Sequence, residues 1–302
     1  MNFKRWNILM PLAAFVLILF IPQAGHAQSV EDVKAMMASI NQQLADIGES
    51  IRLEVAEFQT YQAVGQIIYF DDRTLQLDAQ FVPADPRRSG ETYISWLSDL
   101  TEGIANGVSQ ADTQQAVLDA MTTWDSVDCA TIPLVQYPDL GYDWGFVQYL
   151  TGFGGIPGWL ADITQAGWLP GAFFDAIGGP GASDYILGVT FTFVWTGEDG
   201  NPSDIDNDGK LDVAFREIYY NNSFPWGIDT DYPIDVESIV VHETGHGLSL
   251  GHFGKLFRTL PNGMLHFAPN AIMNAGYTGV DQIPSGTDIA AFCSLWAAWP
   301  VN

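Results

Sequence analysis

The stretch of residues 242–252, HETGHGLSLGH, limits what this chain can fold into more than any other part of its sequence. On a helix, residues four positions apart lie on one face, so the imidazoles of His242 and His246 can reach a single metal ion. Glu243 lies beside the first histidine, where it can hold and deprotonate a water molecule. His252 follows after a turn. Three nitrogen ligands with an open water position are typical of a catalytic zinc site.

The distribution of histidine supports this interpretation. The chain has five histidines, and three of them fall within this stretch. Of the other two, His26 lies in a segment that we expect to be removed, and His266 lies beyond the stretch. The alternative is a helix that carries two histidines by chance, or a motif that no longer binds metal. The clustering favours a zinc site.

An excess of acidic residues narrows the choice of partners. The 302 residues include 36 acidic and 11 basic ones, for a net charge of −25, and no basic residue lies between Arg88 and Lys210. Phosphate binding needs Lys and Arg, so nucleic acid and anionic membranes are not expected partners. Solubility is the preferred explanation of the acidity, while a salty habitat or a cationic substrate would also fit.

The first 27 residues have the pattern of a secretory signal. Lys4 and Arg5 precede an apolar run over residues 8–21, and the small residues of 25–27 offer a cleavage point. We therefore expect residues 1–27 to be removed, and the protein to be secreted or periplasmic with no stable membrane anchor afterwards. An uncleaved anchor is the alternative, although the apolar run is short for a full membrane span.

Two cysteines, Cys129 and Cys293, follow this segment. An exported protein meets an oxidising compartment, where this pair can form one disulfide that closes a long loop. The sequence alone does not show whether the two residues are adjacent.

Residues 28–88 read as a small α+β region, either a propeptide or an integral N-terminal part. Ser29 and Asp32 resemble a capping box that opens a helix ending at Ile47. Strands are expected at 51–56, where apolar and polar residues alternate, and at 66–70. The region ends at Arg87-Arg88, which is either a processing point or simply an exposed loop.

Residues 89–302 carry the pattern of a larger α/β domain. Its strands are expected at 92–97, 132–136, 185–195 and 211–220, and its helices at 109–124, 236–248 and 287–299. Ser109 and Asp235 are the expected N-caps of the first two helices. An insertion at 141–183, rich in Gly and aromatic residues, is expected to form short helices and turns that pack over the sheet.

An acidic loop follows the strand at 185–195. Asp204, Asp206 and Asp208 alternate along it, Asp212 follows, and Gly209 allows a sharp bend. This spacing of oxygen ligands predicts a structural calcium site. It is not a complete EF-hand, because the bidentate Glu of the twelfth position is absent. The alternative is a solvated acidic turn.

Two segments of the sequence resemble those of a known protein family. HETGHGLSLGH looks like the zinc-binding consensus HExxHxxGxxH of the metzincin metallopeptidases, and AIMNAGY at 271–277 looks like their Met-turn. The interval between Met273 and Tyr277 is similar to that of the matrixins. The likeness covers roughly residues 90–302. It implies an α/β (α+β zincin) fold with a twisted mixed sheet, a zinc-binding active-site helix, a Met-turn and a C-terminal helix.

The resemblance also implies an activity and roles for individual residues. It implies a secreted zinc endopeptidase that acts on protein or peptide substrates, with zinc held by the three histidines and Glu243 as general base. Met273 would form a hydrophobic floor beneath the metal, and Tyr277 would shape the substrate pocket.

The chain departs from the family pattern in three respects. Ser249 replaces the consensus glycine before the third histidine, and since serine tolerates that backbone less well, the turn is expected at Gly247 or Gly251. No cysteine-switch motif is present. The second zinc of some family members needs further histidines, and only His266 remains.

Two rival functions stay open. One is an inactive surface interaction module that zinc and calcium stabilise, although such a module has no use for Glu243. The other is a zinc hydrolase that acts on an amide other than a peptide bond, and it would differ only in its pocket.

Overall fold

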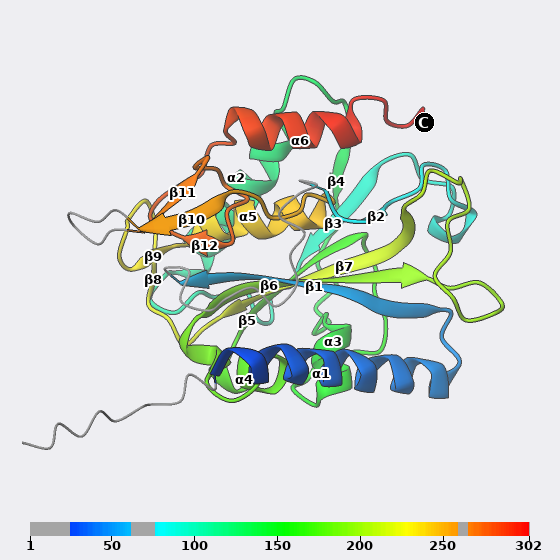
Figure 1. The fold of residues 1–302 in the computed structure, drawn as a ribbon, viewed down its shortest axis with the longest axis horizontal. Coiled ribbons are helices and arrows are strands. Elements are labelled where there is room, and N and C mark those ends of the chain that lie inside the picture. Colours follow the sequence, from blue (N-terminus) through cyan, green and yellow to red (C-terminus); the bar gives the residue numbers. More distant parts are fainter. Residues whose placement is uncertain (1–24, 62–75, 259–264, 302) are drawn as a thin grey trace, which may run out of the picture.

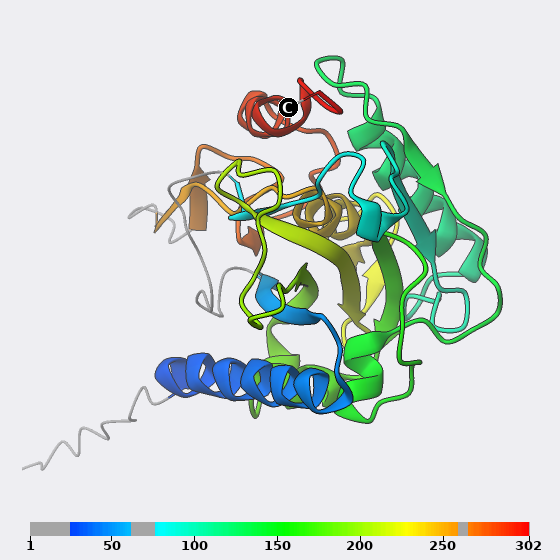
Figure 2. The ribbon, with the colours of Figure 1, turned by 90° about the vertical axis from the view of Figure 1, so that its right-hand side faces the viewer.

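A computed structural model of the chain describes residues 25–61, 76–258 and 265–301. These residues form a mixed α/β fold in three layers, with an eight-stranded sheet between two groups of helices (Figures 1 and 2). The helices are α1 (Gly25–Ile47), α2 (Gln110–Asp125), α3 (Phe146–Thr151), α4 (Gly171–Gly178), α5 (Val236–Gly247) and α6 (Gly286–Trp296). The strands of the sheet are β1 (Ile51–Tyr61), β2 (Ala79–Gln80), β3 (Ile94–Ser98), β4 (Leu134–Gln136), β5 (Ile163–Leu169), β6 (Ile186–Trp195), β7 (Leu211–Asn221) and β12 (Gly276–Tyr277).

Most neighbouring strands of this sheet are parallel. The strand order is β12-β1-β6-β7-β5-β3-β4, and β2 pairs with one end of β7. Within the described residues, the antiparallel pairs of this sheet are β1 with β6 and β6 with β7. Two small ribbons lie outside it, formed by β8 (Trp226–Gly227) with β9 (Ile234–Asp235), and by β10 (Lys255–Arg258) with β11 (Leu265–Ala268).

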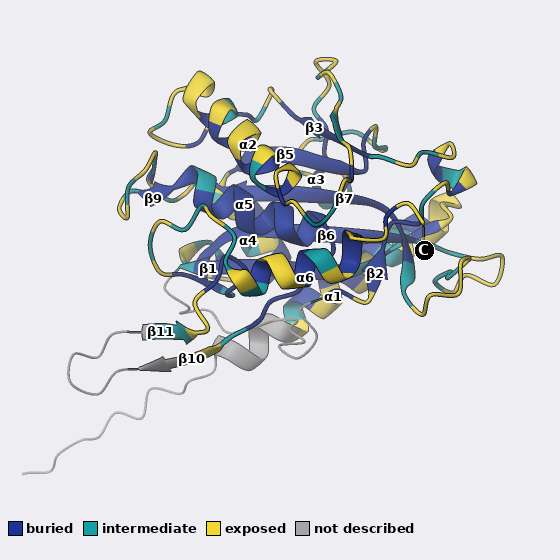
Figure 3. Cartoon of the chain, turned by 90° about the horizontal axis from the view of Figure 1, so that it is seen from above, coloured by how far each residue is buried: buried dark blue, intermediate teal, exposed yellow. Residues whose placement is uncertain are grey.

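Each face of the sheet carries its own hydrophobic core. On one face, α2, α5 and α6 pack through buried side chains such as Trp124, Ile239 and Trp296. On the other face, α1, α3 and α4 cover a cluster that includes Phe58 and Phe174. Helix α5 is buried along its length between the sheet and the outer helices, whereas α2 and α6 expose their outer sides (Figure 3). The histidine helix is therefore a central element of the fold.

Several local predictions are confirmed. The Ser109 side chain accepts a hydrogen bond from the backbone N–H of Asp112 and caps α2, and Asp235 caps α5 in the same way through Ser238. The strands expected at 92–97, 132–136, 185–195 and 211–220 appear as β3, β4, β6 and β7, and the expected last helix is α6. These predictions depend on residues that are close together in the sequence, so contacts with distant parts of the chain do not change them.

The prediction for residues 141–183 is wrong at its centre. Helices α3 and α4 are present, but residues 163–169 form β5, which lies between β3 and β7. All residues of β5 are buried, so the strand has no alternation of polar and apolar side chains. Gly167, with a φ of +107°, also interrupts the pattern beside a register shift against β7.

The N-terminal region contributes to the same sheet as the rest of the chain. Strand β1 pairs with β6 over most of its length, and α1 packs against α4 and β1. Helix α1 begins at Gly25, before the expected Ser29. The strand expected at 66–70 lies outside the described residues, as do residues 1–24 of the expected signal segment.

The Arg87-Arg88 pair is not an exposed loop, which corrects the sequence-based interpretation. The pair lies in a short 3-10 helix (Pro86–Arg88). Arg88 is buried and forms an ion pair with Asp162, with Nε 2.7 Å from Oδ1, and its guanidinium also donates to backbone carbonyls. Arg87 is paired with Asp85 and Asp212. A processing protease that reads this pair would first have to extract both guanidinium groups.

The two cysteines form the expected disulfide. Cys129, in the loop after α2, is bonded to Cys293 of α6, and their Cα atoms are 5.6 Å apart. The bond therefore ties the C-terminal helix to the neighbouring outer helix. Among the helices of the described residues, none has the length and apolar character needed to cross a membrane.

Candidate metal centre

Helix α5 places the first two histidines, and the chain after it returns to supply the third. The Nε2 atoms of His242, His246 and His252 form a nearly equilateral triangle with sides of 3.0–3.1 Å. All three rings are buried, with exposed fractions of 0% for the two helical residues and 3% for His252. The predicted ligands are thus brought together, and their rings are shielded from solvent.

The remaining nitrogen of each ring determines where its lone pair points. His242 Nδ1 lies 2.6 Å from the Ile272 carbonyl oxygen, and His246 Nδ1 lies 2.8 Å from that of Leu250. Carbonyl oxygens only accept hydrogen bonds, so both Nδ1 atoms carry the proton, and in a neutral ring Nε2 then carries none. Burial lowers the pKa of both rings well below the usual value, so both are neutral.

This arrangement fits a bound cation. Bare Nε2 lone pairs that face one another at about 3 Å repel unless a positive charge lies between them. Zinc sits about 2.0–2.1 Å from imidazole nitrogen, and one ion can contact all three atoms of such a triangle. Hydrogen bonds from Nδ1 to carbonyl or carboxylate groups are the usual way in which a protein orients metal-binding rings.

The third histidine lies beside a carboxyl group that the sequence analysis missed. Glu57 Oε2 lies 3.0 Å from His252 Nδ1. Glu57 belongs to β1 and is only 4% exposed, and burial raises its pKa well above the usual value. Burial also lowers the pKa of His252, to about 3. No local signal marks Glu57, because it lies just beyond the alternating residues at 51–56 and its partner is far away in the sequence.

Glu243 lies against the sheet beside the histidines. Its Oε2 accepts a hydrogen bond of 2.6 Å from Thr190 Oγ1, while its Oε1 has no hydrogen-bond partner among the described residues. The carboxylate is fully buried, and burial raises its pKa to about 8. It fits there because residue 188 is a glycine, since a Cβ at Gly188 would lie 2.7 Å from Oε1. One carboxylate oxygen is held while the other is left for a further ligand.

The Met-turn residues lie beneath α5. Met273 is fully buried and approaches Gly245 of α5 so closely that a Cβ there would collide with its sulfur. The backbone N–H groups of Ile272 and Met273 both donate to the carboxylate of Asp288, in the first turn of α6. The same Ile272 accepts from His242. Asp288 therefore fixes the turn that fixes the first histidine, a role that sequence reasoning did not anticipate.

Tyr277 is close to the site but its hydroxyl is engaged elsewhere. Its oxygen accepts a hydrogen bond of 3.2 Å from the backbone N–H of Asp235, the N-cap of α5. Burial raises the pKa of Tyr277 to about 12. A cavity of about 20 Å³ lies beside Tyr277, Ile272 and Gln59, which is room for one water molecule. In this structure Tyr277 therefore packs at the N-terminal end of α5.

The turn before His252 is made by Ser249 itself. Its φ is +69°, whereas Gly247 ends α5 and Gly251 has no positive φ, so the expectation that a glycine carries the turn is wrong. The buried Arg216 compensates, because its Nη1 donates to Ser249 Oγ at 3.0 Å and to the Gly247 carbonyl at 2.9 Å.

Arg216 makes these bonds without a carboxylate partner among the described residues. Its other nitrogens donate to Thr192 and to the carbonyl of Ala79, and the guanidinium lies over the ring of Phe81. Burial lowers its pKa to about 9. A buried cation that is held only by neutral acceptors costs stability unless its donors are used. Here the turn before His252 supplies two acceptors, the Gly247 carbonyl and the Ser249 hydroxyl.

The acidic loop gathers three of its four predicted ligands. Carboxylate oxygens of Asp204, Asp206 and Asp208 lie within 4.8 Å of one another, so the group could hold a cation. Asp212 is not part of this group. Its carboxylate is buried and accepts hydrogen bonds from Arg87 and from the backbone of the loop. It therefore anchors the loop to β7.

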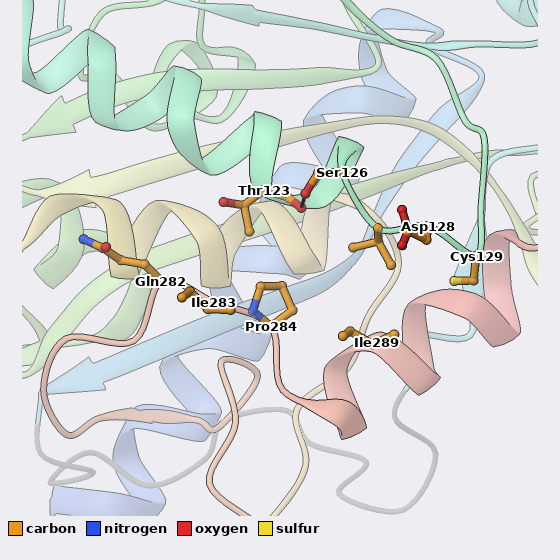
Figure 4. A pocket seen from close by; sticks show the side chains of 9 residues that line it. Thr123, Ser126, Asp128, Cys129, Gln282, Ile283, Pro284 and Ile289 are labelled. Carbon is orange, nitrogen blue, oxygen red and sulfur yellow. Dashed lines mark hydrogen bonds between the residues drawn. The ribbon is translucent and has the colours of Figure 1, made fainter.

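A separate cavity of about 480 Å³ opens between the end of α2 and the start of α6 (Figure 4). Thr123 and Ser126 line one side, and Ile283 and Pro284 line the other. It contains none of the three histidines, so the metal centre and this surface hollow are distinct features.

Comparison with models of known protein families gives no match, and comparison with curated proteins gives no significant one either. The metal centre is therefore interpreted from its own geometry.

Proposed function

We propose that this protein is an exported zinc-dependent endopeptidase of the metzincin type, closest to the matrixins. The observation that carries the proposal is the triangle of three Nε2 atoms with Glu243 beside it. The order of elements supports it as well, with strand β3, the capped helix α2 and strands β4 to β7 before the histidine helix, and the Met-turn and α6 after it. The disulfide is consistent with an oxidising compartment.

The chain's own residues would divide the work as follows. His242, His246 and His252 would hold zinc, and a bound zinc ion lowers the pKa of water and polarises the carbonyl of a peptide bond. Glu243 is the proton carrier. Thr190 holds its Oε2, which leaves Oε1 to accept a proton from water and to return it to the amine nitrogen of the leaving group.

The acidic loop would hold calcium as a structural ion. Its three carboxylates are near one another, and it joins β6 to β7, two neighbouring strands near the centre of the sheet. Oxygen ligands at alternating positions are what calcium requires.

An inactive metal-stabilised interaction module is the second candidate, and one observation favours it. The three histidines and Glu243 are all buried, as in a structural metal site. Against it stands Glu243, because a structural site needs no carboxylate with an unpartnered oxygen beside the ligands. The two candidates differ in whether peptide bonds are cleaved.

The test compares two substitutions on the same helix. Glu243→Gln is expected to retain zinc and to lower peptide hydrolysis by roughly 10²–10⁴-fold, the usual contribution of a general base. Glu237→Gln, in the first turn of α5, is the matched control and should retain both. Zinc is measured by elemental analysis, and hydrolysis with a peptide library in the presence and absence of chelator. Undiminished hydrolysis by Glu243→Gln would refute the proposed role.

A further inference from the structure

The proposed active site is covered by the N-terminal strand. Glu243 and the first two histidines have no exposed surface, and a cavity beside Gln59 and Tyr277 has room for one water molecule. The covering element is β1, whose Glu57 Oε2 lies 3.0 Å from His252 Nδ1 and whose Gln59 backbone N–H faces the Glu243 carboxylate. Residues 57 and 59 of β1 therefore occupy the space next to His252 and Glu243.

Strand β1 is held on both of its edges by the walls of the site. On one edge it runs antiparallel to β6, where Phe58 pairs with Val189 and Gln59 with Gly188. On the other edge it runs parallel to β12, where Thr60 pairs with Gly276. Strand β12 follows the Met-turn directly, and Gly188 is the residue that leaves room for Glu243. The two strands thus form an extended slot that passes over the metal centre.

Main-chain hydrogen bonds provide most of the recognition in such a slot. An extended segment that adds to an exposed strand edge is bound through its backbone, and pockets for alternate side chains give the specificity. The edges of β6 and β12 would therefore accept another extended peptide of the same direction once β1 has left.

We infer that residues 51–61 are a built-in occupant of the substrate position, so that the chain with β1 in place is an inhibited form of the enzyme. The inference rests on the proposed function, and it names the substrate class as an extended peptide that runs antiparallel to β6. Access to the site requires that β1 leaves the sheet, either by opening or by removal together with α1.

The packing of β1 shows which substitution would weaken its attachment to the rest of the fold. Phe58 is 3% exposed and, with Ile40 of α1, belongs to the core on the far side of the sheet from the histidines. A smaller side chain at position 58 weakens the packing of β1 and leaves the contacts of the three histidines and of Glu243 unchanged. Phe174 of α4 belongs to the same core and lies on neither α1 nor β1, which makes it a matched control.

The experiment uses the full chain loaded with Zn²⁺ and compares Phe58→Leu and Phe58→Ala with Phe174→Leu and Phe174→Ala. A chromogenic chelator reports the rate of zinc release, and a peptide library reports hydrolysis. Both rates are expected to rise by at least about tenfold in Phe58→Ala and by less in Phe58→Leu, because the lost packing favours local opening of β1. The two control variants should lose similar stability while both rates stay within about twofold of wild type.

The possible results separate the inference from the proposed function. Equal rates in wild type and in the Phe58 variants would overturn the inference, and Phe58→Leu decides the matter if Phe58→Ala does not fold. The same acceleration in the Phe174 variants would also overturn it, since general destabilisation would then suffice. Faster zinc release without peptide hydrolysis in any variant would support the covering role of β1 and overturn the peptidase proposal.

Discussion

Ser249 offers a quantitative test of how the turn before His252 is stabilised. Its positive φ favours glycine, yet its hydroxyl accepts a hydrogen bond from the buried Arg216. Two substitutions separate these effects. Ser249→Ala removes the hydroxyl and keeps a side chain on the strained backbone, whereas Ser249→Gly removes the hydroxyl and relieves the strain.

The structure gives the expected magnitudes. A hydrogen bond from a charged donor contributes about 1.5–3 kcal/mol, so Ser249→Ala should lower the free energy of unfolding by about 2 kcal/mol. A left-handed conformation costs a non-glycine residue roughly 1–2 kcal/mol, and glycine escapes this cost. Ser249→Gly should therefore be more stable than Ser249→Ala by about 1 kcal/mol, while it remains less stable than wild type.

The assay is urea denaturation of the zinc-free protein, with Ser126 as a control position. Ser126 follows α2 with a φ of −83°, a right-handed conformation, so there the alanine variant should be the more stable of the two. An order of stability at position 249 that matches the order at 126 would refute the argument from backbone strain. An unchanged stability of Ser249→Ala would refute the argument from Arg216.

Three further predictions concern other parts of the fold. Glu57→Ala should weaken zinc binding by about 10–100-fold in chelator competition, because His252 Nδ1 loses the carboxyl group that lies 3.0 Å away, and unchanged affinity would contradict a supporting role for Glu57. Replacing both Cys129 and Cys293 by Ser should lower the free energy of unfolding by up to about 5 kcal/mol, since the bond closes a loop with a sequence separation of 164, and an unchanged Tm would count against it. Burial raises the pKa of Asp281 to about 6, so its contribution to stability is present below about pH 4 and is lost as the pH rises through 6. The Tm of Asp281→Asn relative to wild type should therefore increase between these pH values, and a constant difference would contradict the assignment.

Much of the fold was predictable because its signals are local. The caps at Ser109 and Asp235 define where α2 and α5 begin, and the aromatic and β-branched run of β6 predicts a buried strand. The spacing of His242 and His246 on one helix likewise predicts that their rings meet. Each of these features depends on neighbours within a few residues, so the sequence pattern and the structure agree.

The remaining features depend on distant partners. Strand β5 is buried on both faces and therefore shows no period, and its place between β3 and β7 comes from pairing alone. Glu57 acquires its role only because β1 adds to the edge of β6. Ser249 can adopt a positive φ because Arg216, on β7, reaches it. No pattern within a short window of sequence specifies such contacts.

The hydrogen bonds between Asp288 and the Met-turn have a consequence for the order of folding events. Asp288 lies in α6 and holds the turn that orients His242, while Glu57, on β1, lies beside His252. The candidate metal centre is thus assembled from the first and last elements of the described sheet and helices. A chain that emerges from the ribosome N-terminal end first cannot complete the centre until α6 has been synthesised. Under the proposed function, metal capture would therefore be one of the last events of folding, after translation of nearly the whole chain.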